Sequence, residues 1–319
     1  MTRLTHHVSR QLAADLALLL VTLIWGATFV MVKDAVSAFP VFSFMGVRFA
    51  LAAAALTPLM IWRRRQLAAL APDGPFAAPR RSNLARLRRS ALPSLFIGAA
   101  LFAGYAFQTA GLTLTTPAKA GFITGLSVVI VPLIAALLLG QALGRNAWIG
   151  VSLATVGLAL LSLTADLQVA AGDVLVLGCA FSFAAHILLT GHFAPRYDPL
   201  ALTLGQVLTV TLLSGMAAAL FDVPARGAAT LIGGLNGRVL FAAAFTGLLA
   251  TAAAFGIQTV AQRFTTATHT ALIFAAEPVF AGLFSFLLIG EVLGPRQLLG
   301  CALILAGMIA AEVKRDRAA

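Results

Sequence analysis

The stretch Leu287-Leu288-Ile289-Gly290-Glu291-Val292-Leu293-Gly294 decides the fold, because it occurs twice. A close copy, Leu137-Leu138-Leu139-Gly140-Gln141-Ala142-Leu143-Gly144, lies 150 residues earlier (287 − 137). Further landmarks repeat at the same offset: Gln108-Thr109 and Gln258-Thr259, Thr115-Thr116 and Thr265-Thr266, Gly150 and Gly300, Gly157 and Gly307. Chance matches a few leucines, but rarely these dipeptides and glycines in one register. The sequence therefore predicts an internal duplication of about half the chain.

Composition places the duplicated chain in a membrane. Of its 319 residues, 60% are hydrophobic and only 10% are charged, and the mean hydropathy is +0.97. A soluble domain carries about 25% charged residues. The net charge of +11 comes from basic residues that flank apolar runs, which is typical of membrane topology and not of nucleic-acid binding. Cys179 and Cys301 lie within apolar runs and are predicted to be buried free thiols.

Ten apolar runs are long enough to be membrane-spanning helices, for which about 20 residues are needed. They lie near 13–33, 39–62, 91–113, 118–140, 146–164, 172–192, 199–221, 238–261, 268–290 and 295–313. The arginine-rich segment 63–90 between two of them is predicted to be a solvent loop. With the N-terminus inside, 16 of the 22 Lys and Arg residues fall in inner segments and five in outer ones. This bias predicts a multi-pass protein of the inner (plasma) membrane with both termini in the cytoplasm.

Five helices per copy is an odd number, so the second copy must cross the membrane inverted. We expect a first five-helix repeat at 1–164 and a second at 165–319. Inverted repeats build secondary transporters, whose substrate site lies near the midplane between the repeats. The predicted fold class is an all-α polytopic membrane protein with ten helices in two inverted five-helix repeats.

Two charged residues fall in the middle of predicted spans, where a charge is costly and is usually functional. Glu277 precedes Pro278, which removes a backbone hydrogen bond and favours a kink. Either Glu277 binds substrate or a proton, or it is a structural acid paired with one cation. Arg48 either binds a substrate carboxylate or forms a structural ion pair, for which Glu277 is a candidate partner. The pattern leaves both alternatives open for each residue.

Other candidates for the substrate site are polar or aromatic residues inside spans: Trp25, Phe29, Tyr105, Gln108, Thr124, Ser127, His186, Gln206 and Gln258. Polar residues in spans also often form hydrogen bonds only between helices, which is the competing interpretation. Lys119 and His269 occupy matched positions at helix starts and are predicted to anchor at the membrane interface. The aspartates, Asp15 and Asp173 among them, mostly flank the spans and are expected to be solvated.

The chain resembles a known family at several of these places. Trp25-Gly26-Ala27-Thr28-Phe29-Val30, Arg48, Glu277-Pro278 and the stretch 287–291 are similar to the EamA repeats of the drug/metabolite transporter superfamily. The resemblance covers about residues 13–313. It implies ten helices, an inverted repeat and export of small metabolites, often amino acids. The first copy departs from the family pattern: it has Gln141 where Glu is usual, and Ser127-Val128 opposite Glu277-Pro278.

We therefore expect a secondary transporter that exports amino acids or related small metabolites by alternating access. A multidrug or nucleotide-sugar transporter of the same superfamily is the alternative. An intramembrane lipid enzyme and a membrane scaffold are further alternatives, although no metalloprotease, phosphate-loop or hydrolase motif is present in the sequence. The expected partners are a small-molecule substrate and the lipid bilayer, without nucleic acid, cofactor or metal. Proton coupling stays open, as does the choice between monomer and homodimer.

Overall fold

The chain folds into helices throughout the part that the structure describes. This structure is a computed structural model, and it describes residues 2–70, 80–112, 114–115, 117–141, 143–162, 170–290 and 292–312. The helices of the first half are α1 (Thr2–Ala38), α2 (Val41–Leu70), α3 (Arg80–Leu112), α4 (Pro117–Gly125), α5 (Ser127–Leu139) and α6 (Arg145–Ser162). No strand occurs in these described segments.

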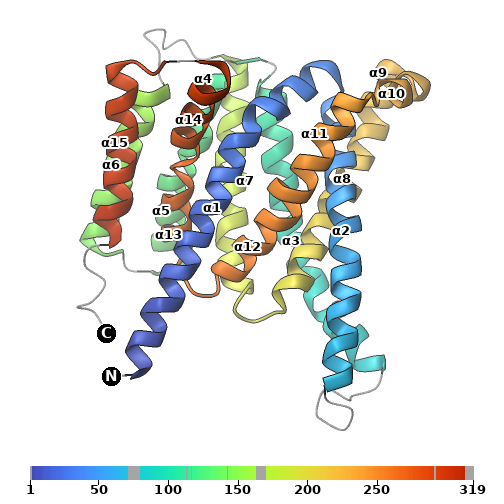
Figure 1. The fold of residues 1–319 in the computed structure, drawn as a ribbon, viewed down its shortest axis with the longest axis horizontal. Helices are drawn as coiled ribbons and strands as arrows, with labels where there is room; N and C mark the ends of the chain where they lie inside the picture. The colour runs from blue at the N-terminus through green and yellow to red at the C-terminus, as the bar shows by residue number, and fades with distance from the viewer. Residues whose placement is uncertain are drawn as a thin grey trace. The chain divides into compact units, whose positions relative to one another are not determined.

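The second half contains more and shorter elements, two of which are π-helical (η1 and η2). They are α7 (Ala171–Phe193), α8 (Pro199–Ala217), η1 (Ala218–Asp222), α9 (Val223–Arg226), α10 (Ala228–Gly234), α11 (Gly237–Gly247), η2 (Leu248–Ala253), α12 (Ala254–Ala261), α13 (Ala267–Phe274), α14 (Glu277–Ile289) and α15 (Pro295–Glu312). Figure 1 shows these elements in order of chain colour. π-helical turns are rare and often lie at functional sites.

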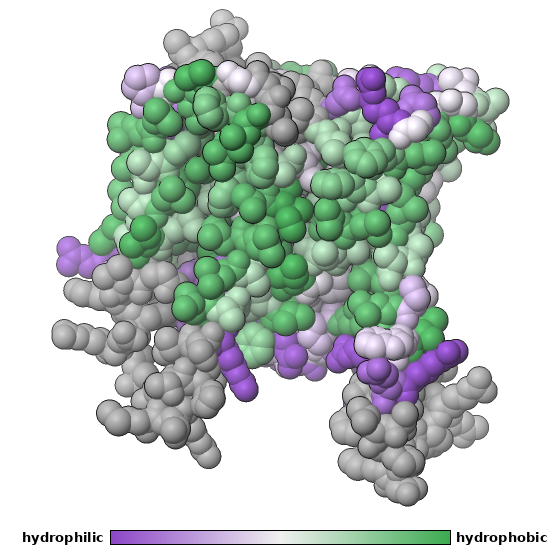
Figure 2. All heavy atoms as spheres, viewed as in Figure 1, coloured by the Kyte–Doolittle hydropathy of each residue, from purple (hydrophilic) through white to green (hydrophobic). Residues whose placement is uncertain are grey.

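Eight helical segments within the described ranges are long and apolar enough to cross a membrane: Arg10–Thr28, Val41–Arg63, Arg89–Gly111, Ala120–Leu138, Ala171–Phe193, Pro199–Arg226, Gly237–Ala261 and Ala267–Phe284. Two further apolar segments, Arg145–Leu161 and Pro295–Ala311, are shorter. Large apolar side chains such as Leu137, which is 80% exposed, would be unfavourable in water and fit a lipid-facing surface. Figure 2 shows such a hydrophobic surface over α14 and α15. The protein is thus a polytopic helical membrane protein.

Glycine ends two helices in the repeated stretch. Gly140 after α5 and Gly290 after α14 have positive φ values of 62° and 69°. Beyond Gly140, the backbone N–H of Gln141 donates to the carbonyl of Ala135 over 3.0 Å, as in a Schellman turn. The left-handed conformation suits glycine because it has no Cβ. The positive φ at the end of each helix therefore explains why glycine stands at this position in both copies.

The described chain forms two compact units, and each unit takes segments from both sequence halves. Unit 1 comprises residues 1–30, 103–191 and 261–319, and unit 2 comprises residues 31–102 and 192–260. The predicted repeats at 1–164 and 165–319 are thus not the compact units. Matched segments of the two copies instead lie in the same unit.

In unit 1, α6 packs against its matched helix α15 through glycines, and the two helices lie side by side in Figure 1. A Cβ on Gly150 would lie 2.6 Å from the carbonyl oxygen of Gly307, and one on Gly157 would lie 2.6 Å from that of Gly300. The contact is reciprocal: Gly150 lies against Gly307, the counterpart of Gly157, and Gly157 lies against Gly300, the counterpart of Gly150. Residue numbers rise along one helix as they fall along the other, so the pair is antiparallel.

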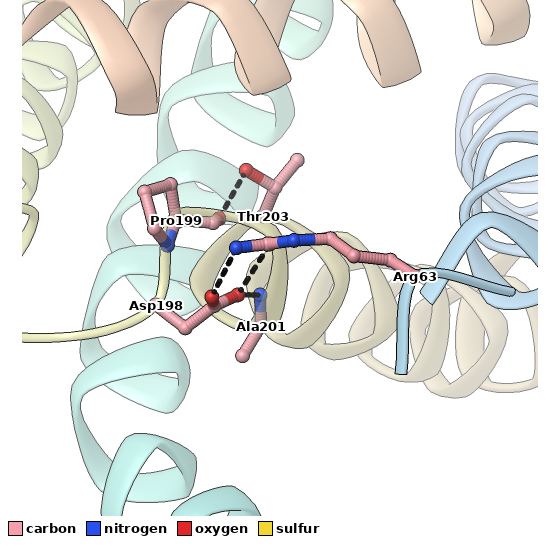
Figure 3. A network of polar contacts seen from close by, with 5 residues as sticks. All are labelled: Arg63, Asp198, Pro199, Ala201 and Thr203. Carbon is pink, nitrogen blue, oxygen red and sulfur yellow. Dashed lines mark hydrogen bonds and ion pairs between the residues drawn. The ribbon is translucent and has the colours of Figure 1, made fainter. Parts of the chain in front are cut away.

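In unit 2, α2 and α8 also pack as an antiparallel pair and are tied at both ends. Near the start of α2, the backbone N–H and the hydroxyl of Ser43 both donate to Asp222 Oδ2 over 2.7 Å. At the other end, Arg63 Nη2 lies 2.9 Å from Asp198 Oδ2 (Figure 3). Asp198 also caps α8 by accepting a hydrogen bond from the N–H of Ala201.

Helix α2 does not end where the basic segment 63–90 begins, contrary to the predicted solvent loop. It continues to Leu70, and α3 already begins at Arg80. Arginine is a good helix former, so a basic run extends a helix beyond its apolar part. Residues 71–79 of this segment lie outside the described residues.

Candidate functional site

Two spans of unit 1 are interrupted at matched positions, and each interruption presents a predicted site residue. The span that contains α4 and α5 breaks at Leu126, and Ser127 begins α5. The span that contains α13 and α14 breaks at Ala275-Ala276, and Glu277 begins α14. The first break has no proline at the position of Pro278, so proline is not its cause. Interrupted membrane helices commonly form binding sites in transporters.

Glu277 is half-buried, and its carboxylate has no hydrogen bond or ion pair within the described part of the chain. A carboxylate in a membrane span needs a cation, water or a ligand to offset the cost of leaving water. Glu277 is therefore placed to bind a cationic group or a proton.

A short chain of polar groups leads from α3 through α4 to Cys179 on α7. Gln108 Nε2 donates to Thr124 Oγ1 over 3.4 Å, and Thr124 Oγ1 lies 3.7 Å from Cys179 Sγ. Gln108 and Thr124 are half-buried, whereas Cys179 is fully buried. Unit 1 thus contains a Gln108–Thr124 pair beside the thiol of Cys179, and Glu277 at the start of α14. This arrangement provides an amide, a hydroxyl and a carboxylate for a small polar ligand.

Aromatic rings from the same unit form two edge-to-face pairs. The rings of Trp25 and Phe274 have centroids 4.8 Å apart, and those of Tyr105 and Phe183 are 5.5 Å apart. Glycine allows the helices to come this close, because a Cβ on Gly26 would lie 2.7 Å from Phe280 Cβ. Trp25 and Tyr105 are half-buried, so both offer apolar surface to a ligand. Phe29 lies in α1, but its side chain is outside the described residues.

Three other predicted residues, His186, Gln206 and Gln258, are buried among the helices. His186 on α7 is 3% exposed. In unit 2, Gln206 Nε2 donates to Thr259 Oγ1 over 3.3 Å, and Gln258 is 1% exposed. Such burial favours the interpretation that polar residues join helices, at least for Gln206 and Gln258.

Arg48 lies in unit 2 and binds the π-helical segment η2. Its Nε donates to Thr251 Oγ1 over 2.8 Å, and its Nη2 donates to the carbonyl of Ala250 over 3.4 Å. The guanidinium also lies 5.6 Å from the ring centroid of Phe49. Because Glu277 lies in unit 1, the pairing of Arg48 with Glu277 stays a prediction.

Three features of unit 1 were missed from the sequence. Cys179 was predicted only as a buried thiol, yet it lies at the end of the polar chain from Gln108 through Thr124. The ring of Phe274 was not predicted to contact Trp25. Asp15 was expected to be solvated, but its side chain is 14% exposed within a span and lies 3.9 Å from His269 Nε2. His269 is 9% exposed and is not at an open interface. The offset that relates the two copies shows that His269 follows a repeated Thr-Thr dipeptide, but it does not show the contact with Asp15.

Metal binding finds no support within the described ranges, where no group of three His, Cys, Asp or Glu side chains comes together. In unit 2, an open depression of about 380 Å³ is lined by Asp34, Asn236, Arg238 and their neighbours. None of the predicted site residues lines it. The candidate site is therefore the half-buried group in unit 1.

The sequence profile of the EamA-like transporter family matches the chain twice, over residues 12–163 and 170–311. The chain belongs to the EamA-like transporter family. An uncharacterized transporter of Archaeoglobus fulgidus is 33% identical over 306 residues, which cover 96% of this chain and 87% of that protein. The family and this relative indicate transport.

A protein of known crystal structure has the same fold. It superposes with a TM-score of 0.71 at 19% sequence identity, over 94% of this chain and 96% of that protein. At this identity the likeness concerns the fold alone. For an EamA-like transporter, the helix breaks and the polar group around Cys179 are then the features to examine for substrate binding.

Proposed function

We propose that this EamA-like transporter exports amino acids or related small metabolites across the inner membrane by alternating access. The half-buried carboxylate of Glu277, at a helix break within an apolar span, carries the proposal. An amino acid has an ammonium group that suits this carboxylate, and a carboxylate that can accept hydrogen bonds from Gln108 and Thr124. The Trp25 ring offers apolar surface for its side chain.

The reciprocal contacts between matched helices support alternating access. Gly150 and Gly157 of α6 meet Gly307 and Gly300 of α15 in an antiparallel crossing, as a two-fold axis perpendicular to the helices would require. Such an axis relates inverted repeats. Two inverted copies can exchange their conformations, and this exchange opens one site first to one side of the membrane and then to the other.

Localisation in the inner membrane with cytoplasmic termini rests on the charge bias of the sequence. Fusions of a reporter that is active only in the cytoplasm, placed at Ala319 and within residues 72–80, test this localisation. Both fusions should be active. A periplasmic reporter at either site would contradict the topology and with it the inverted arrangement.

Transport by proteoliposomes tests the role of Glu277. The wild type, Glu277→Gln and Glu277→Asp are purified and reconstituted. Uptake of each labelled amino acid is measured separately, with and without a pH gradient. Loss of a charge-assisted hydrogen bond costs about 1.5–3 kcal/mol, so Glu277→Gln should lower apparent affinity about 10- to 150-fold. Glu277→Asp keeps the charge and should lose less. Unchanged uptake by well-folded Glu277→Gln would exclude the binding role.

The multidrug alternative gives a different result in the same assay. A carboxylate beside aromatic rings also suits a lipophilic cation. Uptake of tetraphenylphosphonium that depends on Glu277, without uptake of any amino acid, would favour this alternative over amino-acid export.

A further inference from the structure

Asp15 and His269 form a second polar group in unit 1, away from the residues around Cys179. Asp15 lies on α1 and His269 on α13, and Asp15 Oδ2 is 3.9 Å from His269 Nε2. Their side chains are 14% and 9% exposed. The other carboxylate oxygen, Asp15 Oδ1, is buried and has no hydrogen-bond partner in the described part of the chain. The stability of a buried carboxylate without a hydrogen bond depends on the charge of its neighbour.

The surroundings of the pair are mainly apolar. Ala14 and Leu18 of α1 form a buried cluster with Ala261 and Ile273, against which Leu19, Phe274 and Met308 pack. Charged or titratable groups on the elements that pack there are Arg10, Arg145, His186, Arg263, Glu277 and Arg296. Arg10, Arg145, Arg263 and Arg296 are exposed. Asp15 and His269 therefore form a polar contact between α1 and α13 in mainly apolar surroundings.

Another buried acid of unit 1, Asp173, has different contacts. It is the third residue of α7, and it accepts hydrogen bonds from the hydroxyl of Thr115 and, over 2.8 Å, from the N–H of Ala170. Thr115 is the counterpart of Thr265, four residues before His269. These hydroxyl and amide donors do not change their charge with pH.

We propose that Asp15 and His269 form a binding site for one proton. The proposal rests on the transport function above, because it supplies the ion to which export is coupled. An imidazole nitrogen of His269 takes up a proton from water, and the resulting cation attracts the Asp15 carboxylate and holds α1 against α13. Loss of the proton removes the cation and leaves a buried carboxylate beside a neutral ring.

The same two helices carry the ring pair of the candidate substrate site. Trp25 lies on α1 and Phe274 is the last residue of α13, with centroids 4.8 Å apart. A change in how α1 is held against α13 must alter this ring contact. Proton binding at one end of the two helices is thereby linked to the substrate site.

Trp25 fluorescence tests the proton site without any substrate, so the result is independent of transport. Trp62 and Trp148, which are 57% and 38% exposed, are replaced by Phe to leave Trp25 as the sole tryptophan. Emission of this protein in detergent is recorded from pH 4.5 to 9. We expect one sigmoidal step for wild-type Asp15 and His269. His269→Gln should abolish the step, and Asp15→Asn should reduce its amplitude at least twofold.

Two control variants separate the pair from other groups. Asp173→Asn removes another buried acid of unit 1, and His186→Gln removes another buried histidine of unit 1. Both variants should keep the step. His269→Lys should give the low-pH emission throughout the range, because lysine stays charged. A step that persists in folded His269→Gln, or that disappears in His186→Gln, would overturn the proposal. If His269→Gln does not fold, a titrating signal from His269→Lys overturns it equally.

Discussion

Arg48 illustrates how a costly residue can be explained without a ligand. The sequence places an arginine in the middle of a span, and the structure places its guanidinium against Thr251 and Ala250 of η2. The side chain is 5% exposed. Close packing supports this contact, because a Cβ on Gly247 would lie 2.6 Å from the Arg48 carbonyl oxygen. These contacts favour a structural role, in which Arg48 fixes η2 against α2.

The structural role predicts a loss of stability for Arg48→Lys. A lysine has no planar fork and cannot keep the geometry of both hydrogen bonds. We expect the free energy of unfolding to fall by about 1–3 kcal/mol, the cost of leaving a buried polar group unsatisfied. Thermal unfolding in detergent without substrate measures it. Arg65→Lys, at an exposed site on the same helix, is the control and should change little. A fully stable Arg48→Lys with weaker substrate affinity would instead support a ligand role.

Asp198 in Figure 3 both caps α8 and forms an ion pair with Arg63, so variants of the two residues distinguish how much each contact stabilises the protein. Its side chain and that of Arg63 are 45% and 42% exposed, so the ion pair should contribute less than about 1 kcal/mol. Asp198 also caps α8, and losing an N-cap costs about 0.5–2 kcal/mol. We predict that Asp198→Ala lowers the unfolding midpoint more than Arg63→Gln does. Equal effects of the two variants in thermal unfolding would show that the cap contributes nothing.

Among the helices, sequence patterns predicted positions well and interruptions poorly. Apolar runs marked the eight described segments that are long enough to cross a membrane, because hydropathy is summed over some 20 residues. The count of ten spans stays a prediction, since Arg145–Leu161 and Pro295–Ala311 are shorter. The break at Ala275-Ala276 was suggested by Pro278, but the matched break at Leu126 has no such residue. A break of that kind depends on how neighbouring helices pack, which one sequence does not state. The same limit hid the contact between Asp15 and His269, whose partners lie far apart in the chain.

The crossing of α6 and α15 depends on glycines that leave no room for a side chain. We predict that Gly157→Ala and Gly300→Ala each lower the unfolding midpoint, because each Cβ would lie 2.6 Å from a backbone carbonyl oxygen of the opposite helix. Overpacking of this kind typically costs about 1–3 kcal/mol. The double variant should cost less than the sum, since the first substitution already separates the helices.

Gly215→Ala is the matched control for the helix crossing. Gly215 lies within α8, and a Cβ there would meet no atom within 4 Å. Alanine is a better helix former than glycine by about 0.5–1 kcal/mol, so this variant should be as stable as the wild type or more so. Destabilisation by Gly215→Ala equal to that by Gly157→Ala would show that the loss of stability does not depend on the helix crossing.

At the scale of the whole molecule, the duplication does not produce two independent halves. One buried cluster of unit 1 combines Val128 and Leu158 from the first copy with Leu272 and Ile304 from the second. In unit 2, another combines Phe39 and Phe44 with residues of α11. Each unit therefore obtains its core from both copies. Contacts of this kind bind the two copies together while each unit keeps its own packing.

This interleaving predicts that neither half folds alone. A chain cut between residues 164 and 165, in the segment that joins the copies, keeps every helix but divides both cores. Expressed singly, residues 1–164 or 165–319 would leave core positions such as Leu158, which is fully buried in the intact chain, without their partners. We expect each half to be degraded or to aggregate.

Co-expression of the two halves should restore a complex that co-purifies and elutes like the intact protein on size exclusion. Gly157→Ala in the first half should weaken this complex, and Gly215→Ala in the second should not. A monodisperse, helical first half on its own would show that one copy can complete a core, contrary to the packing in both units.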